Sequence, residues 1–250
     1  MKVSVIMPAF NAEDYIETTI RSVQSQTLSD WELLVIDDGS GDGTCQIVEK
    51  LAKRDSRIRL YSNAENRGTA YSRNRGLDLS RGEYVALLDS DDVWRPRKLE
   101  RELERAEAES ADLVYCAYAI VDELGRTVCE PFHVPEETDL SGMLKENVIG
   151  CSTVLLRRSA MSGFRFSEEY YHEDYVLWLD MLRGGKRAAG VDEVLVDYRL
   201  RIGSRAANKA RCAAERWRIY RSFLGLGRGE SLRYFGQYAW AGLAKYRRKE

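Results

Sequence analysis

Short apolar runs alternate with amphipathic stretches along the first half of the chain. The runs are rich in β-branched residues, as buried strands are, whereas the stretches between them repeat apolar residues at helical spacing, as Ile16, Ile20 and Val23 do. The expected strands are residues 3–7, 32–36, 58–61 and 84–88, and the expected helices lie near residues 16–23, 44–54 and 69–79. Because strands that alternate with helices form βαβ units, we expect an α/β fold with a mostly parallel sheet flanked by helices.

The alternation weakens after residue 95. We expect a charged helix over 96–109, a strand over 112–121 that turns at 122–125 into a hairpin partner at 126–128, a loop over 132–138 and a short helix over 140–147. A helix begins at Glu173 and ends before Gly184, and a last strand covers 191–198. No repeat or low-complexity linker divides the chain. We therefore expect one domain over residues 1–203, with a basic helical extension over 204–250.

The charges are distributed unevenly along the chain. The 250 residues contain 38 Lys+Arg and 40 Asp+Glu, which gives a formal net charge of −2. Residues 1–198 contain 24 basic and 37 acidic side chains, whereas residues 199–250 contain 14 basic and 3 acidic ones. A hydrophobic content of 44% supports a packed core and excludes disordered and fibrous classes. The pattern predicts an acidic body and a basic tail that faces anions.

Membrane-spanning and secreted classes are not expected. No run approaches the roughly 18 apolar residues of a spanning helix, and the first residues enter a strand-like segment without a signal sequence. The five cysteines are scattered and form no C-x-x-C motif, as in reduced cytoplasmic proteins. Cys151 either packs as a small hydrophobe or lines a site.

Polar motifs follow three of the expected strands. The first strand runs into Pro8-Ala9-Phe10-Asn11, the second into Asp37-Asp38-Gly39-Ser40, and the fourth into Asp89-Ser90-Asp91-Asp92. Because the carboxyl ends of parallel strands share one edge of a sheet, these motifs converge where α/β proteins bind ligands. No P-loop or G-x-G-x-x-G motif follows the first strand, which argues against P-loop NTPases and dinucleotide dehydrogenases.

Each motif has a functional and a structural interpretation. Two carboxylates one residue apart, at Asp89 and Asp91, can hold Mg²⁺ or Mn²⁺ with substrate phosphates, or can form a polar loop. Asp37 and Asp38 can bind a base or ribose, or only shape a turn. Phe10 can stack on a base or join the core.

Two further groups of charged residues also have both a functional and a structural interpretation. Arg67 and Arg73 can pair with a diphosphate or balance the acidic body. At the start of the expected helix, the carboxylates of Glu173 and Asp174 can serve as a general base or simply favour the helix N-terminus, with His172 beside them.

In this order the motifs resemble the inverting glycosyltransferases of family 2, which have the GT-A fold. The similarity runs from Val3 to about Trp217. The motifs that show the similarity are residues 3–11, 35–40, 66–68, 72–74, 87–94 and 173–174. Residues 147–151 and 198–209 look like those of bacterial enzymes that add a hexose during O-antigen, capsule or teichuronic-acid assembly, often on undecaprenyl diphosphate.

The resemblance implies roles for individual residues. Asp174 is the implied base, with Glu173 beside it, and His172, Cys151 and Trp94 are implied acceptor contacts. The implied metal is Mn²⁺ or Mg²⁺ on Asp91, with Asp89 and Asp92. The implied donor contacts are Pro8, Phe10, Asn11, Asp37, Asp38, Arg67, Arg73, Asp89, Ser90, Arg199 and Arg201. Some family members place a His after the last strand, where this chain has Arg199, Arg201 and Ser204.

The implied reaction is a single displacement that inverts the anomeric carbon. The resemblance favours UDP-glucose or UDP-galactose as donor. A sugar-1-phosphate nucleotidyltransferase is one alternative, although it would carry a Gly- and Arg/Lys-rich loop where Pro8-Ala9-Phe10-Asn11 stands. A non-catalytic carbohydrate-binding protein of the same fold is another.

The tail can pack on the domain or meet a membrane. Leu232, Phe235, Ala239, Leu243 and Tyr246 share one helical face between basic residues. This pattern fits a packed C-terminal helix or an interfacial helix on anionic lipid. A lipid-linked acceptor favours peripheral contact with the inner face of the cytoplasmic membrane. Nucleic acid is disfavoured because no base-stacking aromatic residues interleave with the acidic edge of the sheet.

Overall fold

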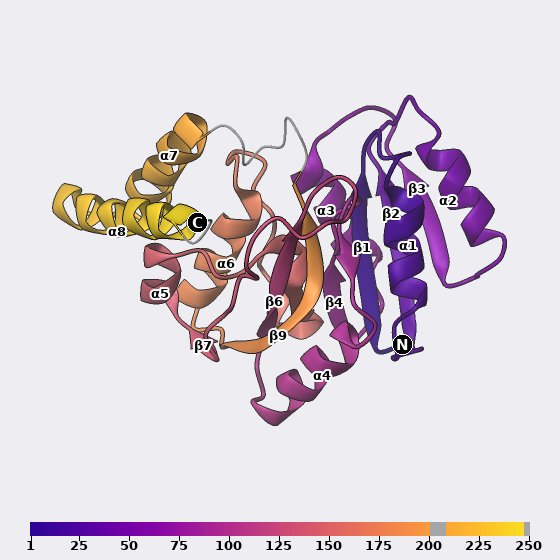
Figure 1. Cartoon of the computed structure of the whole chain (residues 1–250), viewed down its shortest axis with the longest axis horizontal. Coiled ribbons are helices and arrows are strands. Elements are labelled where there is room, and N and C mark those ends of the chain that lie inside the picture. Colours follow the sequence, from indigo (N-terminus) through magenta and orange to yellow (C-terminus); the bar gives the residue numbers. More distant parts are fainter. Residues whose placement is uncertain (201–208, 248–250) are drawn as a thin grey trace.

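A mixed β-sheet with helices on both faces forms the centre of the protein (Figure 1). The computed structural model describes residues 1–200 and 209–247, and the side chains as far as Trp240. Within these residues the sheet has nine strands in the order β3-β2-β1-β4-β8-β6-β9-β5, and β7 pairs with β9. The strands are β1 (Val3–Ala9), β2 (Trp31–Asp37), β3 (Ile58–Ser62), β4 (Tyr84–Leu87), β5 (Val93–Trp94), β6 (Leu113–Val121), β7 (Glu137–Thr138), β8 (Val154–Arg157) and β9 (Ala188–Arg199).

Strands β1 to β4 are parallel to one another, as the βαβ pattern predicts. Strand β8 is antiparallel to both of its neighbours, β4 and β6. The helices are α1 (Ile16–Gln24), α2 (Thr44–Ala52), α3 (Thr69–Leu79), α4 (Lys98–Ala108), α5 (Leu140–Lys145), α6 (Glu173–Arg183), α7 (Lys209–Arg218) and α8 (Arg228–Arg247), with short 3-10 turns at Cys151–Thr153 and Arg158–Met161 and a π turn at Ile219–Phe223.

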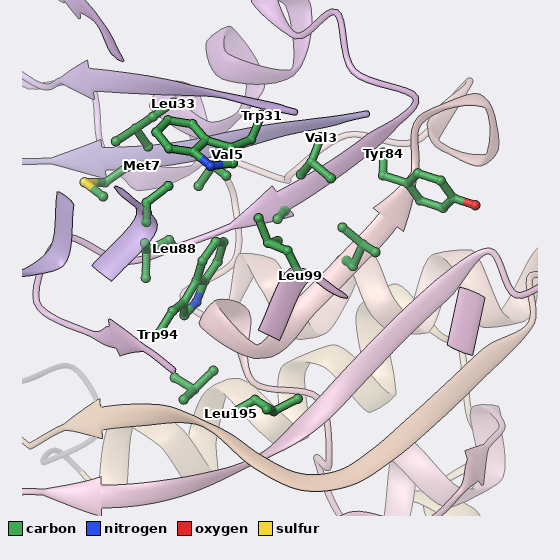
Figure 2. Close-up of a cluster of buried hydrophobic side chains, with 14 of the residues drawn as sticks. Val3, Val5, Met7, Trp31, Leu33, Tyr84, Leu88, Trp94, Leu99 and Leu195 are labelled. Atoms are coloured by element: carbon green, nitrogen blue, oxygen red, sulfur yellow. The ribbon is translucent and has the colours of Figure 1, made fainter. Parts of the chain in front are cut away.

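The sheet separates two hydrophobic cores. Side chains alternate between the faces of a strand, so Val5 and Met7 of β1 enter one core while Ile6 enters the other. The first core lies under α1, α2 and α4, and Figure 2 shows its side chains, including Trp31 and Trp94. The second core lies under α3, α5 and α6 and also contains Tyr234 of α8. Burial on both faces explains why the central strands are nearly continuous apolar runs.

The chain forms the expected elements as far as β4, and the differences lie after it. Strand β8 and the two-residue strands β5 and β7 were not predicted, because each is too short to show a period and is held by residues distant in sequence. The expected hairpin after β6 is reduced to a turn with one bridge between Val121 and Thr127. The expected boundary at residues 203–204 lies outside the described residues.

Helices α7 and α8 pack on the domain. The predicted apolar stripe of α8 divides, since Phe235 packs against Trp217 whereas Leu232 is 62% exposed and Ala239 is also exposed. The side chains of Leu243 and Tyr246 lie outside the described residues. None of the helices in the described part of the chain combines the length and the apolar character needed to cross a membrane.

A buried ion pair in α4 gives a testable stability effect. Lys98 Nζ donates to Glu102 Oε2 at 2.6 Å, both side chains are fully buried, and the ammonium also lies 4.1 Å from the ring of Trp94. Removing one partner leaves the other charge buried without compensation, so Lys98→Met is expected to lower the free energy of unfolding by about 3–5 kcal/mol. Urea denaturation measures this difference.

The matched control is the double variant Lys98→Met/Glu102→Leu, which removes both charges. Because it leaves no uncompensated group, we expect it to be more stable than the single variant. A single variant as stable as the wild type would show that the pair carries no such penalty.

Candidate active site

The loops after β1 and β2 are joined directly to each other. The Asn11 N–H donates to Ser40 Oγ at 2.9 Å, and Asn11 Oδ1 accepts from the Gly41 N–H at 2.9 Å. Asn11 has φ +47°, a left-handed conformation that asparagine tolerates well. Phe10 is 46% exposed, so its ring is presented at the edge of the sheet, whereas Pro8 is buried within β1.

Asp37 and Asp38 are buried and hold the backbone of these loops. Asp37 Oδ2 accepts from the N–H groups of Gly39 and Ser40, both at 3.2 Å. Asp38 Oδ1 accepts from the Arg67 N–H at 3.0 Å, and its Oδ2 accepts from the Gly68 N–H at 2.7 Å. Asp38 thus fixes the start of α3. Contact of either aspartate with a nucleotide base stays a prediction.

The buried guanidinium of Arg73 connects two walls of the site. Its Nη2 donates to Asp89 Oδ1 at 2.6 Å, and its Nη1 donates to Glu173 Oε1 at 2.9 Å. Arg73 and Glu173 are buried, whereas the Asp89 side chain is 32% exposed. One residue of α3 therefore positions the loop after β4 against the first turn of α6. Both of these bonds go to carboxylates, and contact of Arg73 with the donor diphosphate stays a prediction.

The loop after β4 is held from beneath by Asp92 and Ser152. Ser152 Oγ donates to Asp92 Oδ2 and accepts from the Asp89 N–H at 3.0 Å, and the Arg199 N–H donates to Asp92 Oδ1 at 2.9 Å. Burial raises the pKa of Asp92 well above its usual range, and the charges of Asp91 and Asp89 raise it further. The prediction of Asp92 as a metal ligand is wrong in this structure, because both of its oxygens are buried and occupied.

The chemistry of the remaining donors fits a hard cation. Asp89 and Asp91 are partly exposed, and their carboxylates lie one residue apart in the chain. Among the residues described, no three His, Cys, Asp or Glu side chains are arranged so that they could hold a metal ion together. A divalent ion here would therefore bind two carboxylates and complete its coordination with phosphate or water oxygens, as Mg²⁺ commonly does.

The first turn of α6 presents one accessible carboxylate. Asp174 is partly exposed, and its Oδ1 accepts from the Tyr175 N–H at 2.7 Å. Glu173 is 4% exposed and ion-paired to Arg73, so it is poorly placed to accept a proton from a substrate. His172 occupies the N-cap position, and its ring packs edge-on against Tyr171 at 5.2 Å.

Trp94 is not an acceptor contact in this structure. Its side chain is 2% exposed, and its Nε1–H donates to the Ser152 carbonyl at 2.8 Å. Cys151 is also buried, and burial raises the pKa of its thiol well above its usual range. The thiol is therefore not poised to react, and contact of an acceptor with Cys151 stays a prediction.

The arginines that were predicted to contact the donor differ in their surroundings. The guanidinium of Arg67 is exposed and lies 4.2 Å from the ring of Tyr71. Arg199 instead donates from Nε to the Asp91 carbonyl at 2.8 Å and from Nη1 to the Glu123 carbonyl at 2.8 Å. Its guanidinium therefore ties the loop after β4 to the turn after β6, and its contact with the donor stays a prediction. Arg201 lies outside the described residues.

Further contacts fix the loop after β4. The Ser90 carbonyl accepts from Thr19 Oγ1 at 3.0 Å, which ties this loop to α1. The structure also reveals an aromatic group that the sequence did not predict, in which Tyr118 lies 5.1 Å from Phe132 and 5.9 Å from Tyr198. No local pattern marked Tyr118 or Ser152, since both act through residues distant in sequence.

The chain is similar to known proteins in both sequence and structure. Residues 4–162 match the sequence model of "Glycosyl transferase family 2". The chain belongs to glycosyltransferase family 2. TuaG of Bacillus subtilis (strain 168), a glycosyltransferase named for teichuronic acid biosynthesis, is 37% identical over 237 residues, which cover 95% of this chain and 94% of TuaG. This confirms the family predicted from the motifs and makes the chain an enzyme of the glycosyltransferase class.

Two further comparisons extend the family assignment. WfgD of Escherichia coli, named as a UDP-Glc:alpha-D-GlcNAc-diphosphoundecaprenol beta-1,3-glucosyltransferase, is 36% identical over 224 residues, covering 89% of this chain and 86% of WfgD. The mannosyltransferase PcManGT of Pyrobaculum calidifontis, solved with GDP-Man and Mn²⁺, superposes with a TM-score of 0.72 at 19% identity, covering 99% of this chain and 72% of PcManGT. The family 2 enzyme described here therefore has the predicted GT-A fold.

Proposed function

We propose that this enzyme transfers a hexose from UDP-glucose or UDP-galactose to a hydroxyl of a saccharide carried on a lipid diphosphate, with inversion at the anomeric carbon. The observation that carries the proposal is the Arg73 bridge, which places the donor-side carboxylate Asp89 and the Asp174 turn at one edge of the sheet. The names of the relatives support the substrate class, since WfgD is named for UDP-Glc and a diphosphoundecaprenol acceptor.

The residues at this edge of the sheet have separate roles in the proposed reaction. The exposed ring of Phe10 stacks on the base, and Arg67 meets the diphosphate beside it. Asp89 and Asp91 would hold a Mn²⁺ or Mg²⁺, and such an ion would stabilise the negative charge of the leaving nucleoside diphosphate. Asp174 accepts the proton of the attacking hydroxyl. Because Glu173 is neutralised by Arg73, Asp174 is the carboxylate of this turn that remains for the base role.

A donor and acceptor screen tests this function. The purified protein is incubated with Mn²⁺ or Mg²⁺, a panel of nucleotide sugars and a synthetic N-acetylglucosaminyl lipid diphosphate, and nucleoside diphosphate release is measured. We expect release from a UDP-hexose that depends on the acceptor, with a β-linked product by NMR when the donor is α-linked. Release of pyrophosphate from a sugar 1-phosphate and UTP would instead identify a nucleotidyltransferase, and a retained anomeric configuration would exclude the single displacement.

A further inference from the structure

One face of helix α8 is fixed to the protein. Ser231 and Tyr234 are buried, and the ring of Tyr234 lies 6.4 Å from that of Tyr220. The Phe235 ring meets Trp217 edge-on at 5.9 Å. Through these contacts α8 packs against α5 and α7. The helix therefore has a defined orientation, and its other face points away from the domain.

That outer face is apolar and open. Leu232, Gly236 and Trp240 are spaced four residues apart and so lie along one side of the helix. Leu232 is 62% exposed and Trp240 is 69% exposed, and a Cβ placed on Gly236 would meet no atom within 4 Å. A protein that exposes a large tryptophan beside a leucine in this way leaves apolar area in water, which is typical of a surface that binds a partner.

Basic side chains flank the outer face. Arg228 and Arg233 are both exposed, and residues 199–250 contain 14 basic and 3 acidic side chains. An apolar helix face with tryptophan and leucine between arginines is the pattern of helices that lie in a lipid headgroup region. The same charge disfavours a second copy of the chain, because two such faces would repel each other, whereas an anionic bilayer attracts them.

We propose that the outer face of α8, formed by Leu232, Gly236 and Trp240 with Arg228 and Arg233, docks on the surface of an anionic lipid bilayer. Helices α7 and α8 lie at the end of the molecule opposite α2 and β3 (Figure 1). Docking there leaves strands β1 and β2, which Phe10 and Asp38 follow, away from the bilayer. The proposal does not rest on the proposed function, since binding to lipid requires neither donor nor catalysis.

Tryptophan fluorescence provides a direct test. Of the five tryptophans, Trp31, Trp94 and Trp178 are fully buried and the partly buried Trp217 packs against Phe235, whereas Trp240 is exposed on the outer face and is the one best placed to respond when lipid is added. With phosphatidylcholine vesicles that contain phosphatidylglycerol, we expect a blue shift of the emission and quenching by brominated acyl chains at low ionic strength. Trp240→Phe is expected to lose most of this signal while it still co-sediments with the vesicles.

Affinity measurements separate the two contributions. Leu232→Ala/Trp240→Ala and Arg228→Glu/Arg233→Glu are each expected to weaken co-sedimentation about tenfold or more, because one removes apolar burial and the other reverses the attraction to anionic lipid. Leu124→Ala is the matched control: Leu124 is 76% exposed in the turn after β6, far from α8 in sequence. We expect this variant to bind as the wild type does.

Three results would overturn the proposal. The first is wild-type protein that ignores anionic vesicles at low salt, and the second is a double variant of α8 that binds them undiminished. The third is a concentration-dependent dimer that Leu232→Ala/Trp240→Ala abolishes without any change in vesicle binding, since the occupant would then be a second copy. Unchanged thermal unfolding of the variants keeps each result interpretable, and unchanged sugar transfer in detergent-free solution keeps it separate from a failure of the proposed function.

Discussion

Asp174→Asn is expected to lower the rate constant of sugar transfer by roughly 10²- to 10⁴-fold, the range for loss of a general base. The substitution keeps the size of the side chain and the hydrogen bond that Oδ1 accepts from the Tyr175 N–H. It removes the group that receives the proton of the attacking hydroxyl. The rate is measured as kcat at saturating donor and acceptor, and donor binding measured by calorimetry is expected to be unchanged.

Two variants of the same helix serve as controls. Asp180→Asn removes a partly exposed carboxylate from the last turns of α6 and is expected to leave kcat unchanged. Glu173→Gln weakens the bond to Arg73, so we expect it to lower the melting temperature more than Asp174→Asn does, which costs only about 0.3–1 kcal/mol of favourable helix-terminus charge. An active Asp174→Asn, or a Glu173→Gln variant that is folded and fully stable but inactive, would move the base assignment to Glu173.

The sequence predicts the edge of the sheet better than it predicts which side chains face the substrate. Asp89, Asp91 and Asp92 follow a strand of clear apolar pattern, so their location was accessible from the sequence. The sequence does not show which of the three side chains are accessible. Asp92 turns inward to Ser152, a residue brought beside it by the pairing of β8 with β4. Strand β8 has only four residues and no period of its own.

Trp94 also shows that the sequence alone does not predict which side chains face the substrate. The resemblance to the family made it a candidate for acceptor binding. Burial depends on what covers a residue, and Trp94 is covered by Lys98 and by residues of β9 that follow about a hundred positions later. The apolar stripe predicted on α8 is likewise only partly buried. Its burial depends on contacts with α5 and α7, which the spacing of apolar residues along the helix does not predict.

Arg73→Met is expected to lower the free energy of unfolding by about 3–5 kcal/mol, because it removes the buried guanidinium that compensates the charge of the buried Glu173 carboxylate. In the folded fraction we also expect a loss of about 10²-fold in kcat/KM, since Arg73 holds Asp89 and the Asp174 turn in register and small displacements of reacting groups are costly. Urea denaturation and steady-state kinetics below the unfolding transition measure the two effects separately.

The controls separate the geometry of Arg73 from its charge. Arg73→Lys keeps the charge but replaces a planar fork by a single ammonium, which cannot hold Asp89 and Glu173 in the same arrangement. We therefore expect it to recover more of the stability than of the activity, with a weakened affinity for donor and Mn²⁺ because Asp89 is no longer fixed. Arg81→Met, at an exposed position after α3, removes a charge without touching the network and is expected to change neither quantity. If Arg73→Lys restored activity and stability in equal measure, the bridge would act only as a buried charge and not as the device that aligns the two walls of the site.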